Sequence, residues 1–301
     1  MGVIFFMQKK IILVDGNNII NRAFYAVPLL SNNMGEFTNA VYGFLNIILK
    51  LYQDEKPSHS IIAFDTPKLT FRHEVFDEYK TNRKESPNEL KSQFITLKNL
   101  LKAMQICFCE KEGFEADDLL GTLAIKFLDL DFDVIIFSGD TDLLQIADKK
   151  IKIYVPKNKK NQKQTLTEIY DYDSVVEKYG ITPREFIDFK ALKGDKSDNV
   201  PGICGIGEKN ALKIIKEYKS IENAIIELKK KKKRNLTLQE KNLIENEDKA
   251  LFYKKLIAIN KNVGIEISEQ QAELKNIFND DCLKELHRLN LNSIIARVNN
   301  F

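Results

Sequence analysis

Four short apolar runs, separated by longer stretches with helical spacing, constrain the fold of this chain more than any other feature. The runs are residues 11–14 (IILV), 61–64 (IIAF), 134–137 (VIIF) and 151–155 (IKIYV). Apolar residues recur at helical spacing in residues 40–52, 90–104 and 119–128. Strands that alternate with helices predict a mostly parallel central sheet covered by helices on both faces. We therefore expect an α/β domain over residues 1–180.

Strand-like runs become scarce after Thr182, and helical periodicity continues to the end of the chain. Pro183 suits the first turn of a helix. We expect a smaller helical lobe over residues 181–301. The polar stretch KNKKNQK at residues 157–163 fits either domain, so the position of the boundary stays open.

Composition narrows the class of protein without deciding its chemistry. The chain has 301 residues, 44% of them hydrophobic, and carries 46 Lys+Arg against 43 Asp+Glu. These charges suit either a basic surface around an acidic pocket or an evenly solvated surface. The four cysteines form no CxxC pair, which predicts reduced thiols and no zinc site. The apolar stretch in MGVIFFMQKK is too short for a signal peptide or membrane anchor, so we expect a cytoplasmic protein without a membrane partner.

Aspartates follow three of the four predicted strands. Asp15 and Asp65 come directly after their strands, and Asp140 and Asp142 follow residues 134–137 within a few positions. The carboxyl ends of parallel strands meet at one edge of a sheet, where such folds bind their ligands. A single aspartate in this position is more often a turn or cap residue, but three cases together favour a shared site.

Two further segments add five acids. The helix start GFEADDLL contains Glu115, Asp117 and Asp118, and LKGDKSDNVPG contains Asp195 and Asp198. Helix capping is the alternative explanation for the first group. Nine carboxylates cannot share a pocket as bare anions, because each like-charge pair about 4 Å apart costs on the order of 4 kcal/mol at an effective dielectric of 20. Oxygen ligands without His or Cys point to two Mg²⁺ or Mn²⁺ ions, the usual arrangement for phosphodiester hydrolysis.

The ordered motifs VDGNN, AFD, FRHEVFDEYKTNR, GFEADDLLGTLA, SGDTDLLQI and LKGDKSDNVPGICGIGEKNA resemble the 5′ nuclease (flap endonuclease) family. The resemblance covers nearly the whole chain and is strongest to the 5′–3′ exonuclease domain of bacterial DNA polymerase I. It implies a PIN-like or resolvase-like sheet and a C-terminal lobe with a helix–three-turn–helix element around residues 186–218. The sequence alone does not decide between a free-standing nuclease and a piece of a longer polymerase.

The resemblance also implies roles for the nine acids. It assigns Asp15, Asp65, Glu115 and Asp117 to a first metal ion and Asp140, Asp142 and Asp198 to a second. It implies that Asp118 and Asp195 act on the metals through water. Among these acids, we expect Asp15, Asp65 and Asp140 to be catalytic.

Basic and aromatic residues between the first two acidic groups form the next candidate region. Phe76, Tyr79, Lys80 and Arg83 would share a face if this segment were helical, and a plain amphipathic surface helix is the alternative. The resemblance implies a helical arch around residues 66–100. From it we expect Lys80 and Arg83 to be catalytic by contacting the scissile phosphate, Tyr79 to stack on a nucleotide, and Arg72 to contact DNA.

A glycine-rich turn precedes the helical pattern of residues 210–218. Gly202, Gly205, Gly207 and Lys209 lie in it, and backbone amides at a helix start can bind phosphate without reading bases. A simple helix-packing turn is the alternative. The resemblance implies that this element grips duplex DNA, and that it often includes K⁺.

Together with the family resemblance, these observations predict a structure-specific 5′–3′ exonuclease or flap endonuclease that removes primers and 5′ flaps in DNA replication and repair. Its partners would be flapped, nicked or gapped DNA and RNA–DNA primers, with a DNA polymerase and a ligase acting in the same process. We expect a monomer. The competing hypotheses are a PIN-like ribonuclease and a DNA-binding module without catalytic activity.

Overall fold

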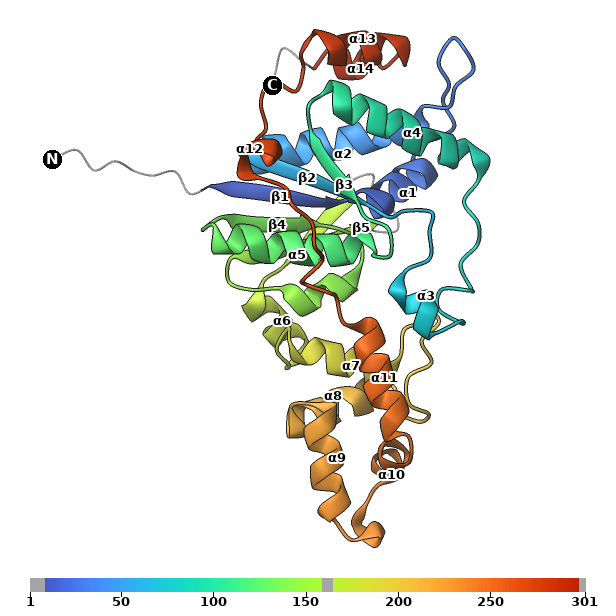
Figure 1. The fold of residues 1–301 in the computed structure, drawn as a ribbon, viewed down its shortest axis with the longest axis vertical. Coiled ribbons are helices and arrows are strands. Elements are labelled where there is room, and N and C mark those ends of the chain that lie inside the picture. Colours follow the sequence, from blue (N-terminus) through green and yellow to red (C-terminus); the bar gives the residue numbers. More distant parts are fainter. Residues whose placement is uncertain (1–8, 159–164, 298–301) are drawn as a thin grey trace, which may run out of the picture.

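The computed structural model describes residues 9–158 and 165–297 (Figure 1). Residues 1–8, most of the polar stretch 157–163, and residues 298–301 lie outside the described residues. The first half contains β1 (Lys10–Asp15), α1 (Gly16–Ala26), α2 (Asn39–Glu55), β2 (His59–Phe64), α3 (Phe71–Val75), α4 (Asn88–Ala103), β3 (Cys107–Glu110), α5 (Ala116–Asp129), β4 (Asp133–Phe137) and the 3₁₀ helix η1 (Thr141–Ile146). The remainder contains β5 (Ile151–Asn158), β6 (Thr165–Tyr170), α6 (Tyr172–Tyr179), α7 (Glu185–Lys193), α8 (Glu208–Tyr218), α9 (Ile221–Lys230), η2 (Lys233–Asn235), α10 (Leu238–Glu245), α11 (Glu247–Ile257), α12 (Glu269–Ala272), α13 (Asp280–Arg288) and α14 (Asn292–Ile295).

The strands form one six-stranded sheet in the order β3-β2-β1-β4-β5-β6. All neighbouring pairs are parallel except β5 and β6. The predicted α/β class with a mostly parallel sheet is therefore confirmed. Two strands were not predicted from the sequence: β3 (CFCE) contains no β-branched residue, and β6 (TLTEIY) pairs at the antiparallel edge.

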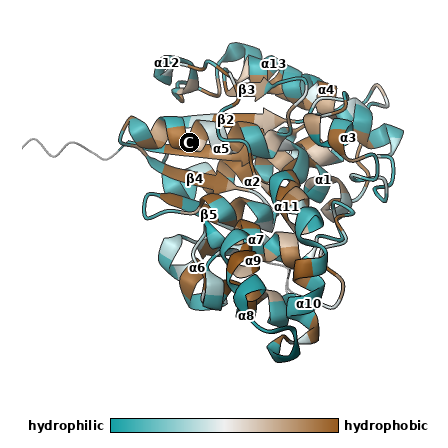
Figure 2. Ribbon diagram, turned by 60° about the horizontal axis from the view of Figure 1, so that its bottom comes forward, coloured by the Kyte–Doolittle hydropathy of each residue, from teal (hydrophilic) through white to brown (hydrophobic). Residues whose placement is uncertain are grey.

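Alternate residues of the strands supply two separate cores. Ile11 and Leu13 point to the face covered by α5, whereas Ile12 and Val14 point to the face covered by α1, α2 and α4. The central strands are apolar on both faces, as Figure 2 shows by their brown colour between helices with teal outer surfaces. Because both faces are covered, polar chemistry is confined to the ends of the strands.

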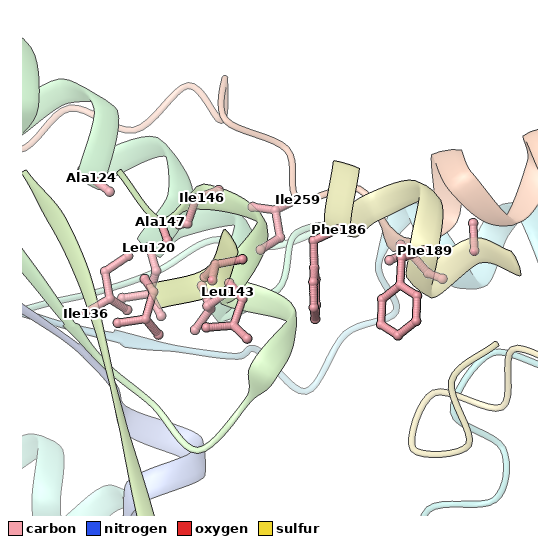
Figure 3. Close-up of a cluster of buried hydrophobic side chains, with 14 of the residues drawn as sticks. Leu120, Ala124, Ile136, Leu143, Ile146, Ala147, Phe186, Phe189 and Ile259 are labelled. Atoms are coloured by element: carbon pink, nitrogen blue, oxygen red, sulfur yellow. The ribbon is translucent and has the colours of Figure 1, made fainter. Parts of the chain in front are cut away.

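The helices α7–α11 form a lobe that is continuous with the core on the α5 face. Phe186 of α7 packs in one cluster with Leu120 of α5 and Leu143 of η1 (Figure 3). Both phenylalanines of α7, Phe186 and Phe189, are almost fully buried. This shared core holds the helical lobe against the elements that carry the acidic residues.

The helical arch expected around residues 66–100 is not a continuous helix. Helix α3 ends at Val75, residues 77–82 form turns, and residues 83–87 are irregular before α4 begins. Lys80 adopts a left-handed conformation with φ 56°, and its amide donates to the carbonyl of Asp198. The expected helical face of Phe76, Tyr79, Lys80 and Arg83 therefore does not form, because long-range contacts with the 194–200 loop hold this segment in turns.

The predicted helical lobe of residues 181–301 also needs a correction at its C-terminal end. The chain leaves α11 and returns to the α/β domain, where α12, α13 and α14 lie (Figure 1). Leu274 donates its amide to the carbonyl of Ser58, next to β2, and Asn279 donates to the carbonyl of Ala103 at the end of α4. Cys282 and Leu286 belong to the core on the α2 face. An apolar stripe on α13 that fits this core explains why the segment does not stay in the lobe.

In the part of the chain that the structure describes, every helix is too short or too polar to cross a membrane.

We predict that Leu286→Ala destabilises the protein although it lies far along the chain from the sheet. Leu286 has no exposed surface, so the change leaves a cavity and should lower the free energy of unfolding by about 2–5 kcal/mol. Lys284→Ala, on the exposed side of the same helix, is the control and should change it by less than about 0.5 kcal/mol. Urea denaturation measures both, and equal effects would contradict the packing of α13.

Candidate active site

A polar cavity of about 860 Å³ lies beyond the carboxyl ends of β1, β2 and β4. Six of the nine predicted acids line it: Asp15, Asp65, Glu115, Asp117, Asp140 and Asp195. Basic side chains of Lys80, Arg83, Lys84 and Lys190 line the same cavity. Residues 182 positions apart in the sequence, Asp15 and Ser197, thus meet at one edge of the sheet.

Each central acid is fixed by the start of a helix or by a neighbouring strand. Asp15 ends β1 and caps α1, accepting from the amide of Asn18 at 2.9 Å and from the hydroxyl of Ser138 at 2.7 Å. Asp65 accepts from the amide of Ala116 at 2.7 Å. These caps keep some oxygens of the carboxylates in place, so capping and site formation are compatible rather than alternative roles.

The remaining central acids lie at helix starts. Glu115 is the N-cap residue of α5, and Asp117 lies in the first turn of that helix. Asp140 caps η1 by accepting from the amide of Asp142 at 2.8 Å. Helix N-termini favour negative charge, which partly offsets the crowding of these acids.

Burial and mutual repulsion make the acids reluctant to ionise. Burial, followed by the charges of Asp65 and Asp140, raises the pKa of Asp15 to about 7. The pKa values of Asp65, Asp117 and Asp140 are also raised, in each case by burial first and by neighbouring carboxylates second. A pocket with this charge distribution favours the binding of cations.

Three side chains from the 76–87 segment contact acids at or beside the cavity. Lys80 donates to Glu115 at 2.6 Å, and Arg83 donates to Asp198 at 2.8 Å. The hydroxyl of Tyr79 contacts both acids, at 3.1 Å from Glu115 and 2.9 Å from Asp198. Burial opposes the charge of Lys80, but Glu115 and Asp198 hold its pKa above the ordinary value.

Lys190 of α7 joins two of the predicted acids. Its ammonium lies 2.5 Å from Asp142 and also pairs with Asp195. Burial and the charge of Asp140 raise the pKa of Asp142 to about 7. Burial opposes ionisation of Asp195 too, but Lys190 and two hydrogen bonds from Ser197 lower its pKa to about 2. Lys190 therefore pairs with both acids at once.

The structure does not bring Asp118 to the cavity, in contrast to the sequence-based expectation. Its side chain is fully buried and binds the guanidinium of Arg72, at 2.7 and 2.8 Å. Arg72 is 3% exposed and cannot contact DNA as expected. Tyr79 is also 3% exposed, so its ring does not present a stacking surface. An arginine and a tyrosine in a basic, aromatic stretch look like surface residues in the sequence, whereas partners far along the chain bury them here.

The predicted glycine turn lies between α7 and α8. Gly202 and Gly205 have positive φ angles of 71° and 78°, and Gly207 caps α8 without a side-chain hydrogen bond. Lys209 is exposed in the first turn of α8. The first amides of α8 are thus open to an external acceptor such as a phosphate.

No three His, Cys, Asp or Glu side chains among residues 9–158 and 165–297 converge closely enough to enclose a metal ion as they stand. The donor set nevertheless suits a hard divalent cation, because the cavity offers carboxylate oxygens with raised pKa values and no nitrogen or sulfur ligand. The ammonium groups of Lys80 and Lys190 form ion pairs with Glu115 and Asp142, two of the acids that such an ion would need as ligands.

Sequence reasoning missed several residues of the site. Asn17, Asn18 and Asn21 line the cavity, and Asn18 also accepts from the amide of Gly139. The sequence GNN directly after Asp15 places Asn17 and Asn18 at the same strand end, and this pattern could have identified both residues. Lys190 had no such signal, because its role depends on Asp142, which is 48 positions earlier and on another element.

Comparisons with known proteins find relatives over nearly the whole chain. The family model of the 5′–3′ exonuclease N-terminal resolvase-like domain matches residues 10–180, and that of the 5′–3′ exonuclease C-terminal SAM fold matches residues 181–280. DNA polymerase I of Bacillus subtilis is 43% identical over 294 residues, which are 97% of this chain and 32% of that protein. The 5′–3′ exonuclease of Aquifex aeolicus is 35% identical over 291 residues, covering 97% of this chain and 96% of that protein. The chain thus spans about a third of the length of the DNA polymerase I relatives.

Solved structures show the same fold. The T5 5′-exonuclease with bound zinc has a TM-score of 0.66 at 22% identity, covering 97% of this chain and 98% of that chain. The T5 flap endonuclease in a pseudo-enzyme–product complex with DNA and metal ions has a TM-score of 0.66 at 21% identity, covering 97% of both chains.

The raised pKa values predict a pH dependence of stability in the metal-free protein. Asp15 and Asp142 ionise near 3.8 when unfolded and near 7 when folded. Between these values the folded state holds protons that the unfolded chain has lost, so the free energy of unfolding decreases as the pH rises. We expect the melting temperature in EDTA to fall from pH 5 to pH 8. The fall should be smaller in Asp15→Asn, and an unchanged fall would contradict the assignment.

Gly202 provides a test of the turn before α8. A Cβ atom there would lie 2.5 Å from the amide nitrogen of Gly194, so Gly202→Ala should lower the free energy of unfolding by more than about 1 kcal/mol. Gly207 has a negative φ angle, and a Cβ atom at this position would meet open space. Gly207→Ala is therefore the matched control, and similar urea midpoints for the two variants would exclude a constraint at Gly202.

Proposed function

This chain belongs to the 5′–3′ exonuclease family, and from that membership we propose that it is a metal-dependent, structure-specific 5′ nuclease. It would hydrolyse phosphodiester bonds of DNA as a 5′–3′ exonuclease and flap endonuclease, removing primers and 5′ flaps in replication and repair. The observation that carries this proposal is the meeting of carboxylates with Lys80 and Arg83 in one cavity. This reaction needs carboxylates that hold metal ions, and it also needs basic side chains that bind the phosphate.

The residues that would hold metal are five acids that line the cavity, together with Asp142 and Asp198, whose partners Lys190 and Arg83 line it. Asp15, Asp65, Glu115 and Asp117 would hold one Mg²⁺ or Mn²⁺ ion. Asp140, Asp142 and Asp198 would hold the other, with Asp195 acting through water. Asp118 leaves this set because its oxygens are engaged with Arg72 and backbone amides. When bound, the two ions would activate a water for attack on phosphorus and offset charge on the phosphate oxygens.

Lys80 and Arg83 would bind the scissile phosphate. Both line the cavity, and the side chain of Arg83 is 49% exposed whereas that of Lys80 is 16% exposed. Their present partners are Glu115 and Asp198, so cations and substrate entering together would release both side chains toward the phosphate. There they would stabilise negative charge that develops on its oxygens.

The lobe would hold the duplex next to the cleavage site. The open amides at the start of α8 and the exposed Lys209 suit phosphate oxygens without selecting a base sequence. We include the backbone amides of Gly202, Gly205 and Gly207 in this contact. K⁺ at this turn is part of the proposal on the strength of the family resemblance.

The DNA substrates of the proposal are 5′ flaps, nicked or gapped duplexes and RNA–DNA primers. The likeness to DNA polymerase I supports a functional link with a polymerase, whose nicked product a ligase would seal. We further propose that the protein acts as a monomer in the cytoplasm.

A 5′-labelled flap substrate tests the proposal directly. We expect cleavage with Mg²⁺, none with EDTA, and much slower cleavage of hairpin RNA. Asp140→Asn should abolish cleavage yet bind the flap in Ca²⁺ with wild-type affinity, because it removes a carboxylate from the cavity and no phosphate contact. Asp129→Asn, at the exposed end of α5, should behave as wild type. Preferential cleavage of the RNA would favour the ribonuclease hypothesis, and flap binding without cleavage would favour the noncatalytic module.

Lys80→Ala separates catalysis from binding. Single-turnover cleavage should slow by about 10²–10³-fold, because a donor to the phosphate is lost in the transition state. The dissociation constant for the flap in Ca²⁺ should rise by less than about tenfold. Lys84→Ala removes a neighbouring cation of the same cavity and should have a small effect on both. Equal losses of rate and affinity in Lys80→Ala would argue against its catalytic role.

A further inference from the structure

Arg72 and Asp118 form a buried ion pair immediately behind the acidic cavity. The two nitrogens Nη1 and Nη2 of Arg72 bind Oδ2 and Oδ1 of Asp118 at 2.7 and 2.8 Å. Arg72 is 3% exposed and Asp118 is not exposed at all. A bidentate pair of this kind is geometrically specific, and it costs much more to break than to keep.

The carboxylate of Asp118 has no remaining capacity for a metal or a water. Oδ1 accepts from Arg72 and from the amide of Asn260 at 2.8 Å, and Oδ2 accepts from Arg72 and from the amide of Glu115 at 3.1 Å. A carboxylate has about four lone-pair sites, and these four donors fill them. The acid therefore has a different task from that of the acids in the cavity.

Arg72 also reaches Glu115, which lines the cavity. Its Nη1 lies 3.5 Å from Oε2 of Glu115, while Lys80 contacts the other oxygen, Oε1. Both backbone and side chain of Glu115 thus contact the buried pair: the amide binds Asp118, and the carboxylate faces Arg72. Any shift of the pair changes the position of this carboxylate.

The same pair binds the segment that leaves the helical lobe. Arg72 donates from Nε to the carbonyl of Leu256 at 2.8 Å and from Nη2 to the carbonyl of Ala258 at 3.0 Å. Leu256 lies in the last turn of α11, and the chain that follows this helix crosses α5 on its way to α12 (Figure 1). Gln145 of η1 binds the next residues, donating to the carbonyl of Ile257 and accepting from the amide of Ile259. Ile259 packs beside α5 and η1 in Figure 3.

We propose that Arg72 is a positioning residue for Glu115, that Asp118 is its anchor, and that the pair fixes the end of α11 relative to the acids of α5. This inference rests on the proposed function. A helical lobe that holds a duplex is thereby connected through residues 256–260 to a carboxylate of the cavity. The pair would influence the metal site by positioning Glu115, and it would contribute no metal ligand itself.

Mn²⁺ binding to the whole 301-residue chain without DNA, followed by the electron paramagnetic resonance signal of free Mn²⁺, tests the proposal. The variants are Asp118→Asn, the double variant Arg72→Met/Asp118→Asn, the cavity variant Asp140→Asn, and Asp129→Asn as a control on the same helix. The double variant avoids leaving an unpaired buried charge. Thermal unfolding in EDTA fixes a temperature at which every variant is folded.

We expect Asp118→Asn to bind the same number of Mn²⁺ ions as wild type, about 10–100-fold more weakly, as is typical when a residue that orients a ligand is changed. The double variant should match Asp118→Asn within about threefold, because both changes remove one interaction unit. Asp140→Asn should bind fewer ions, and Asp129→Asn should match wild type.

Two results would overturn the positioning role alone. Loss of an ion in Asp118→Asn, as in Asp140→Asn, would make Asp118 a ligand. Unchanged Mn²⁺ affinity with only a lower melting temperature would make the pair purely structural. Absence of Mn²⁺ binding in the wild type is a separate outcome, because it would remove the proposed function together with this inference.

Discussion

Repulsion among carboxylates at one edge of the sheet is the constraint on which the rest of the structure depends. The parallel strands bring Asp15, Asp65 and Asp140 together, and the starts of α5 and η1 add more negative charge to the same volume. In the described structure, basic side chains compensate this charge from several directions: Lys80 and Arg83 from the 76–87 turns, Lys190 from α7, and Arg72 from behind the cavity. Burial of these pairs is tolerable only because each cation has more than one acidic partner or a carbonyl group to bind.

This compensation also joins the two parts of the chain. Asp142 belongs to the α/β domain, whereas Lys190 and Asp195 belong to the lobe, and their contacts cross between the two. The turns around Lys80 are fastened to the lobe as well, through the carbonyl of Asp198. A site built in this way requires the α/β domain and the lobe to keep one relative position. The geometry of the acids therefore depends on where the lobe lies.

The sequence was sufficient to predict the features that local patterns determine. Alternating strands and helices predicted the sheet, and aspartates directly after strands predicted Asp15 and Asp65 at its edge. The same reasoning failed for residues whose environment is created by distant partners. Arg72 and Tyr79 are residue types that often contact DNA, yet both are buried here. Arg72 is hydrogen-bonded to Asp118, and Tyr79 is hydrogen-bonded to Glu115 and Asp198. The 76–87 segment has helical spacing, yet hydrogen bonds to residues 196–199 hold it in turns. Asp118 is next to Asp117 in sequence, but it is held by Arg72 and two backbone amides and does not line the cavity, which spacing alone did not reveal.

The return of α13 and α14 to the α2 face has a consequence for the order of folding during synthesis. Chain segments generally fold as they emerge from the ribosome, N-terminal parts first. Here Leu286, Leu289 and Ile294 complete a core whose other members, such as Phe44 and Leu97, were made about 200 residues earlier. A nascent chain that has already built the sheet and the lobe therefore still exposes apolar surface on α2 and α4. Translation must pass Ile294 before that surface is covered, and a ribosome that stalls between the codons for α11 and α13 would leave an aggregation-prone intermediate.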